Sequence, residues 1–458
     1  MMLSRLVRFS TFALTIAASG VAQTPTPAAP APAAASPAPA PGQPDESALG
    51  TMVITGHTVE KLPKIAILPS LAPDLEDVVV RSVVRRDLEI SGLFEIISDK
   101  NAPPGLYSFD EAVDVDAWTK LGAEAIVKVA ARATKGGKVE VLGLAYFLDV
   151  GKDPVYQKKL VVDKTQVRVT AHRITDALLG ALTGRPGGFA SEFALSGKWT
   201  KNRRVFRMDS DGNGLLPITD PADTAIAPTW GPNSSIFYSV SKNYSPFQLY
   251  QWANGQHSPV PVPVRTSIYS VAFNKDFTKI AIAVGDYGKS AIYVGSPDGK
   301  NLQKVSNTDL ATHPAWSPSG KLAWVGGSAS HGTQRIYVDG KPASPQGFPA
   351  GAPTFCDTED GIRLVYSVSV GNDRQDLIMS SETGQGLSRL TQGQGSNTYP
   401  ACSPDGRLLA FFSTRNKTPG LYAMSLKRFS TILVTTQTGE SLRWHALPPP
   451  PPDASAKP

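Results

Sequence analysis

Residues 189–447 repeat a short pattern about every 43 residues, and this periodicity restricts the possible folds more than any other feature of the chain. In each repeat a small or proline-containing step leads to an anchor residue, which in most repeats is aromatic. The anchors are separated by 39 to 47 residues, and they are Trp230, Phe273, Trp316, Phe355, Cys402 and Trp444. Tight-turn glycines keep the same period, and they are Gly212, Gly255, Gly299, Gly340 and Gly384. Repeats of about 40–45 residues, each with four short strands, are typical of β-propeller blades.

The two ends of the array predict six blades and a closed ring. Three strands at 191–197, 203–209 and 215–219 precede the first complete repeat and lack an anchor strand. A last anchor strand at 440–447 lacks the other three strands. Together they would form a sixth blade, in which pairing of the first and last strands removes the exposed edges of an open array.

Residues 51–188 predict a smaller α+β domain before the propeller, which spans 189–447. Strands are expected at 64–68, 93–97, 125–130, 139–148 and 157–163, and helices at 75–90, 113–121 and 170–182. This order predicts two or three helices on one face of a mixed sheet. No glycine-rich phosphate loop follows the first strand, so no nucleotide cofactor is expected.

The two ends of the chain have the composition of processing and spacer segments. Residues 1–22 combine Arg5 and Arg8 with a short apolar run and the small residues Gly20-Val21-Ala22, which is typical of a secretory signal peptide. The apolar run is shorter than a membrane span, so no direct membrane insertion is expected. An Ala/Pro-rich linker follows at 23–50, and a Pro-rich tail occupies 448–458.

Charge and cysteine content exclude several classes of partner and cofactor. The net charge of +6 is spread thinly, and the basic run 201–204 is too short for a nucleic-acid site. Two cysteines and six scattered histidines contain no metal-binding motif, so no metal is expected. Cys356 and Cys402 lie on neighbouring anchor strands at different offsets from the preceding proline. Their side chains are therefore expected to leave opposite faces and to remain two buried thiols.

Loops that precede the anchor strands should meet at one mouth of the central channel. The candidate residues there are Ile226, Ser267, Tyr269, Thr312, His313, Tyr399 and Glu440. Tyrosine and histidine among small residues suit a protein interface better than a reaction, although ordinary solvated loops are the alternative. No G-x-S-x-G nucleophile motif occurs. A secreted glycosidase or lyase using channel carboxylates such as Asp309 and Glu440, or a small-molecule-binding propeller, stays open as an alternative function.

Several local motifs resemble the TolB family, the periplasmic component of the Tol–Pal system. One is the helix segment Ala171-His172-Arg173-Ile174-Thr175-Asp176, with Leu182-Thr183-Gly184 after it. The hairpin segment 144–150 and the blade motifs at 316–320 and 402–406 also resemble the family. The blade motif alone is shared with other propellers, but the order of signal peptide, α+β domain and six-bladed propeller strengthens the resemblance.

The resemblance implies a non-catalytic periplasmic scaffold in a Gram-negative bacterium, without cofactor or catalytic residues. It implies that the propeller mouth binds the outer-membrane lipoprotein Pal. The scaffold would then link Pal to inner-membrane Tol proteins for outer-membrane integrity and constriction at division. Other outer-membrane proteins are further candidate partners. A TolA-like inner-membrane protein would contact the N-terminal segment through Met52, Val53 and Ile54, although the residues fit an ordinary first strand equally well.

Overall fold

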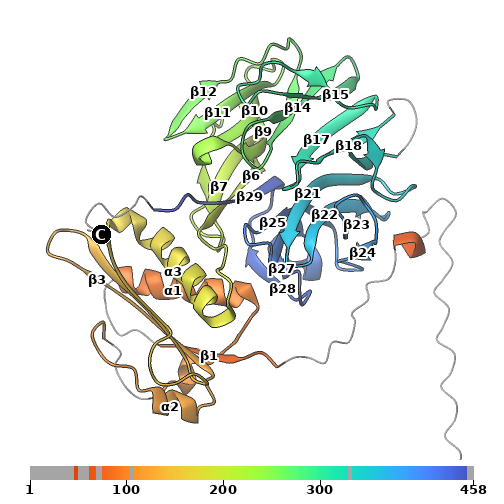
Figure 1. Ribbon diagram of the computed structural model, residues 1–458. Helices are drawn as coiled ribbons and strands as arrows, with labels where there is room; N and C mark the ends of the chain where they lie inside the picture. Colours follow the sequence, from red (N-terminus) through yellow and green to blue (C-terminus); the bar gives the residue numbers. More distant parts are fainter. Residues whose placement is uncertain (1–45, 50–60, 69–74, 104–107, 329–332, 451–458) are drawn as a thin grey trace, which may run out of the picture. The chain divides into compact units, whose positions relative to one another are not determined.

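The computed structural model describes residues 46–49, 61–68, 75–103, 108–328 and 333–450, which form an α/β domain and a β-propeller (Figure 1). The predicted signal peptide and the tail from residue 451 lie outside the described residues. Met52, Val53 and Ile54 lie outside them as well. Within the described ranges, no helix is both long enough and apolar enough to cross a membrane.

The α/β domain is built on a five-stranded mixed sheet in the order β2-β1-β3-β4-β5. Its strands are β1 (Lys64–Ile67), β2 (Glu95–Ile96), β3 (Ala125–Ala133), β4 (Val139–Phe147) and β5 (Tyr156–Val162). β1 pairs in parallel with β2 and β3, whereas β4 pairs antiparallel with β3 and β5. The predicted mixed sheet is confirmed.

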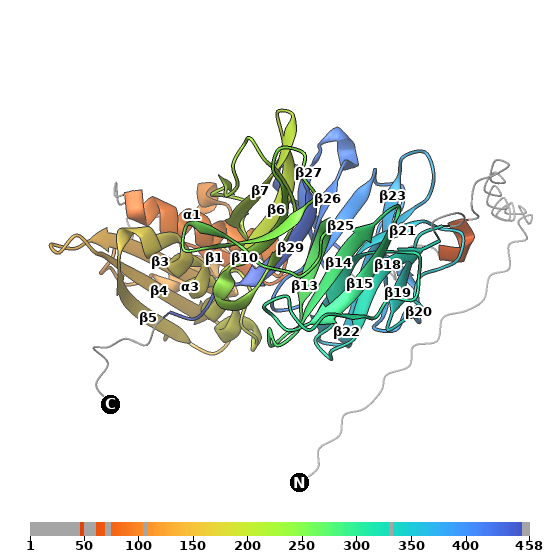
Figure 2. The same cartoon turned by 90° about the horizontal axis from the view of Figure 1, so that it is seen from above.

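Helices cover both faces of this sheet. They are α1 (Leu75–Ser91), α2 (Val115–Lys120) and α3 (Val167–Thr183), with single 3-10 turns at Asp99–Asn101 and Lys164–Gln166. Ile65 and Ile67 of β1 join the core of α1 and α3, which lie side by side in both views (Figures 1 and 2). Ala66 and Leu68 pack with α2 in a separate cluster. Of the two or three helices expected on one face, α1 and α3 share a face, whereas α2 packs on the other, because β1 is apolar on both sides.

The propeller consists of six four-stranded antiparallel sheets (Figure 1). Blade 1 contains β9 (Thr224–Trp230), β10 (Ile236–Ser241), β11 (Gln248–Ala253) and β12 (Gln256–Pro259). Blade 2 contains β13 (Ile268–Phe273), β14 (Ile280–Asp286), β15 (Lys289–Gly295) and β16 (Gln303–Lys304). Blade 3 contains β17 (Leu310–Trp316), β18 (Leu322–Gly327), β19 (Arg335–Val338) and β20 (Lys341–Pro342). Blade 4 contains β21 (Ala350–Thr358), β22 (Gly361–Ser369), β23 (Gln375–Ser381) and β24 (Ser388–Arg389).

Blade 5 contains β25 (Asn397–Cys402), β26 (Leu408–Ser413), β27 (Gly420–Ser425) and β28 (Thr431–Thr435). Short 3-10 turns lie at Pro232–Ser234 and Arg415–Lys417. The sixth blade combines the two ends of the array, as predicted. The final strand β29 (Glu440–Ala446) pairs with β6 (Ser191–Trp199), which continues to β7 (Asn202–Asp209) and β8 (Leu216–Pro217). This pairing closes the ring and confirms the six-bladed propeller.

A short segment before the α/β domain lies on blade 4. Glu46–Leu49 forms a 3-10 turn, and the Leu49 side chain is fully buried among blade 3 and 4 residues. The Glu46 carboxylate accepts hydrogen bonds from Arg374 at 2.6 Å and from Arg389 at 2.7 Å. The predicted linker 23–50 therefore includes an ordered turn, Glu46–Leu49, which one apolar and two ionic contacts hold against the propeller.

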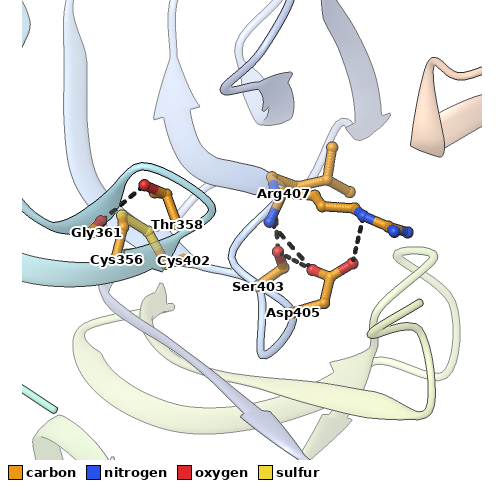
Figure 3. The surroundings of a disulfide bond; sticks show 8 residues. Cys356, Thr358, Gly361, Cys402, Ser403, Asp405 and Arg407 are labelled. Atoms are coloured by element: carbon orange, nitrogen blue, oxygen red, sulfur yellow. Dashed lines mark hydrogen bonds and ion pairs between the residues drawn. A yellow bond between two sulfur atoms is a disulfide. The ribbon is translucent and has the colours of Figure 1, made fainter. Parts of the chain in front are cut away.

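Cys356 and Cys402 form a disulfide, with their Cα atoms 5.4 Å apart (Figure 3). The prediction of two buried thiols is wrong. Its premise of opposite faces treats β21 and β25 as strands of one sheet, but they are inner strands of consecutive blades. Blades stack face to face, so one face of blade 4 meets the other face of blade 5. Side chains that leave opposite faces of equivalent strands therefore point toward each other.

The turn after Cys402 is fitted closely against blade 4 (Figure 3). Ser403 accepts a hydrogen bond from the Leu408 amide at 2.9 Å, and the Asp405 carboxylate accepts one from Arg407 N at 3.3 Å. A Cβ atom on Gly406 would lie 1.8 Å from the Asp357 carbonyl oxygen, so only glycine fits there. The disulfide and this turn together join blades 4 and 5 at the inner edge of the propeller.

We predict that replacing both cysteines by alanine lowers the free energy of unfolding by about 2–4 kcal/mol, because the crosslink spans 46 residues and restricts the unfolded chain. Urea unfolding of the double variant and of the wild type, each with and without dithiothreitol, measures the difference. The reductant should destabilise only the wild type. Equal stability of the oxidised wild type and the variant would contradict the prediction.

Candidate functional site

Every inner strand of the propeller carries a β-bulge near its start. The bulged residues are Ala227, Tyr269, His313, Ala352, Tyr399 and Ser441. All except Tyr269 adopt positive φ angles between 49° and 53°. Bulges redirect side chains and bend a strand, so six bulges at one level form a ring around the central channel.

Proline explains four of these bulges. Pro228, Pro314, Pro353 and Pro400 directly follow the bulged residue and have no amide hydrogen for the ladder. Regular pairing resumes one residue later, for example at the Ala315–Ala323 pair of blade 3. The small or proline-containing step that marks each repeat is therefore the sequence signature of this ring.

All seven predicted mouth residues lie at the same end of the propeller, where the inner strands begin. Ser267 directly precedes β13, and its hydroxyl accepts a hydrogen bond from the Phe247 amide at 3.2 Å. The others lie on inner strands, and they are Ile226, Tyr269, Thr312, His313, Tyr399 and Glu440. We call this end of the propeller, with these seven residues, the channel mouth.

His313 and Tyr399 are held inside the channel rather than on its outer surface. The His313 amide donates to the Ser270 hydroxyl at 3.3 Å, which joins blade 3 to blade 2. Burial and the charge of Arg443 lower the pKa of His313 to about 4, so the imidazole is neutral at pH 7. Burial and the Glu440 carboxylate raise the pKa of Tyr399. The inner part of the mouth is therefore partly desolvated.

Tyrosines project from the outer part of the mouth. Tyr244 and Tyr287 are fully exposed in the loops between the second and third strands of blades 1 and 2. The antiparallel register places both loops at the mouth, since the ends of β10 and β14 pair with the starts of β9 and β13. Tyr269 is 39% exposed, and its ring lies against the Gly285 backbone, where a Cβ atom would be 2.3 Å away.

An ion pair lies on the rim in blade 6, which is next to blade 1 in the ring. Arg203 donates two hydrogen bonds, each 3.1 Å long, to the Glu440 carboxylate. Sequence reasoning found Glu440 but not Arg203. It also missed Tyr244 and Tyr287, although their separation of 43 residues matches the blade period and was a usable signal. Arg443 was given no role, although it lies in the last copy of the repeat motif, directly before the anchor Trp444.

A second cluster of titratable side chains joins α1 and α3 to the opposite end of blade 6. Arg168 donates to the carboxylates of Asp209 and Asp211, at 2.7 Å in each case. His172 Nδ1 lies 2.8 Å from Asp87, and its Nε2 lies 3.9 Å from Asp209. The predicted helical position of His172 is confirmed, and its side chain is buried in this ionic cluster.

Three side chains of this cluster are close enough together to share a metal ion. One ligand atom each from His172, Asp209 and Asp211 lie within 4.8 Å of one another. The guanidinium of Arg168 already bonds to both aspartates, so it supplies the positive charge that a metal would bring. We therefore assign these residues to domain contact rather than to metal binding.

Comparison with known proteins agrees with this architecture. A family model described as the TolB amino-terminal domain matches residues 51–148. Tol-Pal system protein TolB of Anaeromyxobacter dehalogenans is 26% identical over 237 residues, which cover 51% of this chain and 54% of the relative. The same-named protein of Syntrophotalea carbinolica is 31% identical over 177 residues, covering 36% and 38%. These alignments span about half or less of the length of the curated relatives.

The solved structure of TolB from Acinetobacter baumannii shares the fold along most of the chain. It superposes with a TM-score of 0.69 at 20% identity, covering 84% of this chain and 97% of that one. The chain is TolB-like. The TolB-like architecture places α3 at one end of the propeller ring and leaves the channel mouth at the other, as the contacts of Arg168 and the strand register require.

We predict that the His172 cluster of this TolB-like protein makes its stability depend on pH. Burial alone would lower the pKa of His172, but the Asp87 carboxylate and the two propeller aspartates raise it to about 10. A folded-state pKa above the unfolded value stabilises the protein below about pH 6.5, and this stabilisation is lost as the pH rises toward 10. In His172→Gln, the fall in unfolding free energy across this range should shrink by roughly 1–3 kcal/mol.

Urea unfolding at pH 6.5, 8 and 9.5 measures how the unfolding free energy of the wild type and of His172→Gln changes with pH. Lys152→Gln, which removes an exposed lysine from the same domain, serves as a control and should keep the wild-type slope. Parallel pH profiles for wild type and His172→Gln would contradict the assignment.

Proposed function

We propose that this TolB-like chain is a non-catalytic periplasmic scaffold that binds a Pal-like outer-membrane lipoprotein at the channel mouth. The observation that carries the proposal is the pair of fully exposed tyrosines, Tyr244 and Tyr287, at equivalent positions beside the mouth. They contribute little to the packing of the propeller itself. Tyrosine is enriched at the energetic centres of protein interfaces, where it buries much area with few rotatable bonds.

The backbone beneath these tyrosines supports an interface role. Tyr244 has a φ of 61° and Tyr287 a φ of 39°, in the left-handed region that non-glycine residues rarely occupy. Such conformations are unfavourable by about 1–3 kcal/mol each, and they concentrate at functional sites. In Tyr287 the constraint comes from a two-residue hairpin turn between Asp286 and Lys289. The ring of bulged inner strands provides the rigid frame that holds both loops.

The carboxylates considered for a glycosidase or lyase are engaged in ion pairs. Asp309 accepts a hydrogen bond from Lys289 at 3.1 Å, and Glu440 is paired with Arg203. General acid–base hydrolysis needs two carboxyl groups flanking one substrate bond, with one of them protonated. Two ion-paired carboxylates do not favour that arrangement, which supports the scaffold over the enzyme alternative.

We further propose that the scaffold works in the periplasm and also contacts the inner-membrane Tol proteins. A disulfide suits an oxidising compartment, and it agrees with the predicted signal peptide. A TolA-like protein would bind the segment containing Met52, Val53 and Ile54, which precedes β1. Other outer-membrane proteins are further candidates for the mouth. The two sites would let one molecule join both membranes and support envelope integrity and constriction at division.

We predict that Tyr244→Ala/Tyr287→Ala weakens binding of the soluble domain of a Pal-like lipoprotein by at least tenfold, since two interface tyrosines would be truncated. Tyr269→Ala/Tyr399→Ala should weaken it further. Isothermal titration calorimetry with the mature protein gives the dissociation constants. Val161→Ala, which truncates an exposed residue of β5 in the α/β domain, serves as the control. Wild-type affinity in both tyrosine variants would contradict the proposed site.

We predict that Met52→Ala/Val53→Ala/Ile54→Ala abolishes binding of the periplasmic domain of a TolA-like protein and leaves Pal-like binding unchanged. Surface-attached partner domains and the purified variant test both interactions in one experiment. If the variant still binds the TolA-like domain, the proposed contact is wrong, and the alternative of an ordinary strand at residues 52–54 is favoured.

A further inference from the structure

Arg443 occupies an unusual position in the propeller. It lies on β29, one residue before the anchor Trp444 and two residues after the bulged Ser441. The equivalent residues of the other five inner strands are all small, and they are Thr229, Ala272, Ala315, Thr354 and Ala401. One long cationic side chain therefore stands in a ring of short ones.

Arg443 is partly buried, and it differs in its partners from other arginines with buried or partly buried side chains. Arg389 is paired with Asp376 and Glu46, and Arg168 is paired with two aspartates. Arg415 bonds to Asn397 and packs over two aromatic rings. Within the part of the chain that the structure describes, Arg443 forms no ion pair, and its hydrogen bond goes to the neighbouring Leu442 carbonyl at 3.0 Å. A partly desolvated cation without a counter-charge is less favourable than a paired one, and a carboxylate ligand would supply the missing charge.

Arg443, His313 and Tyr399 lie on the inner strands β29, β17 and β25, at or just after the bulges that surround the central channel. Its charge lowers the pKa of His313 in blade 3, and it acts on Tyr399 in blade 5. Burial lowers the pKa of Arg443 itself to about 10, so the group is still cationic at pH 7. His313 is neutral there, and its Nδ1 bonds to the Thr312 hydroxyl at 3.1 Å, so its Nε2 can accept or donate one further hydrogen bond. The Tyr399 hydroxyl can both donate and accept. These three side chains, from three blades, combine one positive charge with neutral hydrogen-bonding groups.

We propose that Arg443, His313 and Tyr399 form a carboxylate-binding site in the central channel, which receives an acidic side chain of the protein docked at the mouth. Arginine presents a planar fork that matches a carboxylate, and a partly desolvated channel strengthens the pairing. The equivalent positions of the other five inner strands carry neither a charge nor a long side chain. The proposal rests on the proposed docking of a partner at this mouth.

The test compares Arg443→Gln with Arg443→Lys and with Lys275→Gln. Lys275 is exposed in the turn after β13, at the other end of the propeller, so its substitution removes the same charge far from the mouth. Calorimetric titration with the soluble domain of a Pal-like lipoprotein should show at least tenfold weaker binding for Arg443→Gln. Arg443→Lys keeps the charge but loses the fork, and should lose less affinity. Lys275→Gln should bind as the wild type does.

The partner's acidic group is then identified by a double-mutant cycle. Each exposed aspartate or glutamate of the lipoprotein domain is changed to its amide and titrated against wild type and Arg443→Gln. One amide substitution should weaken binding to the wild type by at least tenfold and have little further effect on Arg443→Gln. Circular dichroism and thermal unfolding establish that the variants are folded. If Arg443→Gln does not fold, the cycle is carried out with Arg443→Lys.

The outcomes separate this proposal from the proposed function. Equal binding of the lipoprotein domain to wild type and Arg443→Gln would overturn the carboxylate site and leave the docking intact. If the lipoprotein domain binds neither protein, the proposed function fails, and N-acetyl-L-glutamate is titrated in its place. Millimolar binding of this probe to the wild type but not to Arg443→Gln would sustain the site. No binding to either protein would overturn it.

Discussion

The hydrogen bonding of β29 to β6 is the interaction on which the rest of the propeller depends. It joins residues about 250 positions apart, as in the Trp444–Phe193 pair, and converts an open row of sheets into a ring. Without it, the inner strand β29 and its neighbour β6 would expose unpaired backbone groups, and the inner strands would not be held at one level. The ring of bulges, the channel and its mouth are therefore consequences of closure rather than of any single blade.

The periodicity in the sequence predicts the ring because it reports backbone geometry directly. The step before each anchor is a bulge with proline in four blades, so the signal that reveals the repeat is also the feature that shapes the channel. The complementary ends of the array predict closure for the same reason. The seven mouth residues could be assigned to one end, since each precedes or begins an inner strand. Their binding role stays a prediction.

Contacts between neighbouring blades, and between the sheet and its helices, were harder to predict from the sequence. The alternation of side chains along a strand predicts that Cys356 and Cys402 leave opposite faces of their strands. That these faces meet follows only from the stacking of blades 4 and 5, which the sequence does not show. The second apolar face of β1 is visible in Ala66 and Leu68, yet short apolar runs do not say which helix covers them. Arg443 lies in the last copy of the repeat, and it stands out only when the six inner strands are aligned, because the equivalent residues of the other five are small.

Closure of the ring also determines when during folding the channel mouth becomes able to bind a partner. β29 contributes both the closing hydrogen bonds and Arg443, so the channel group and the ring are completed by the same strand. Contacts between residues so distant in sequence form slowly, after local hairpins. A folding intermediate with five finished blades would have its exposed tyrosines in place but no cation at the axis. A partner that needs both the exposed tyrosines and the cation would therefore bind the closed propeller and not the unclosed intermediate. The strand order itself would then restrict binding to fully folded molecules.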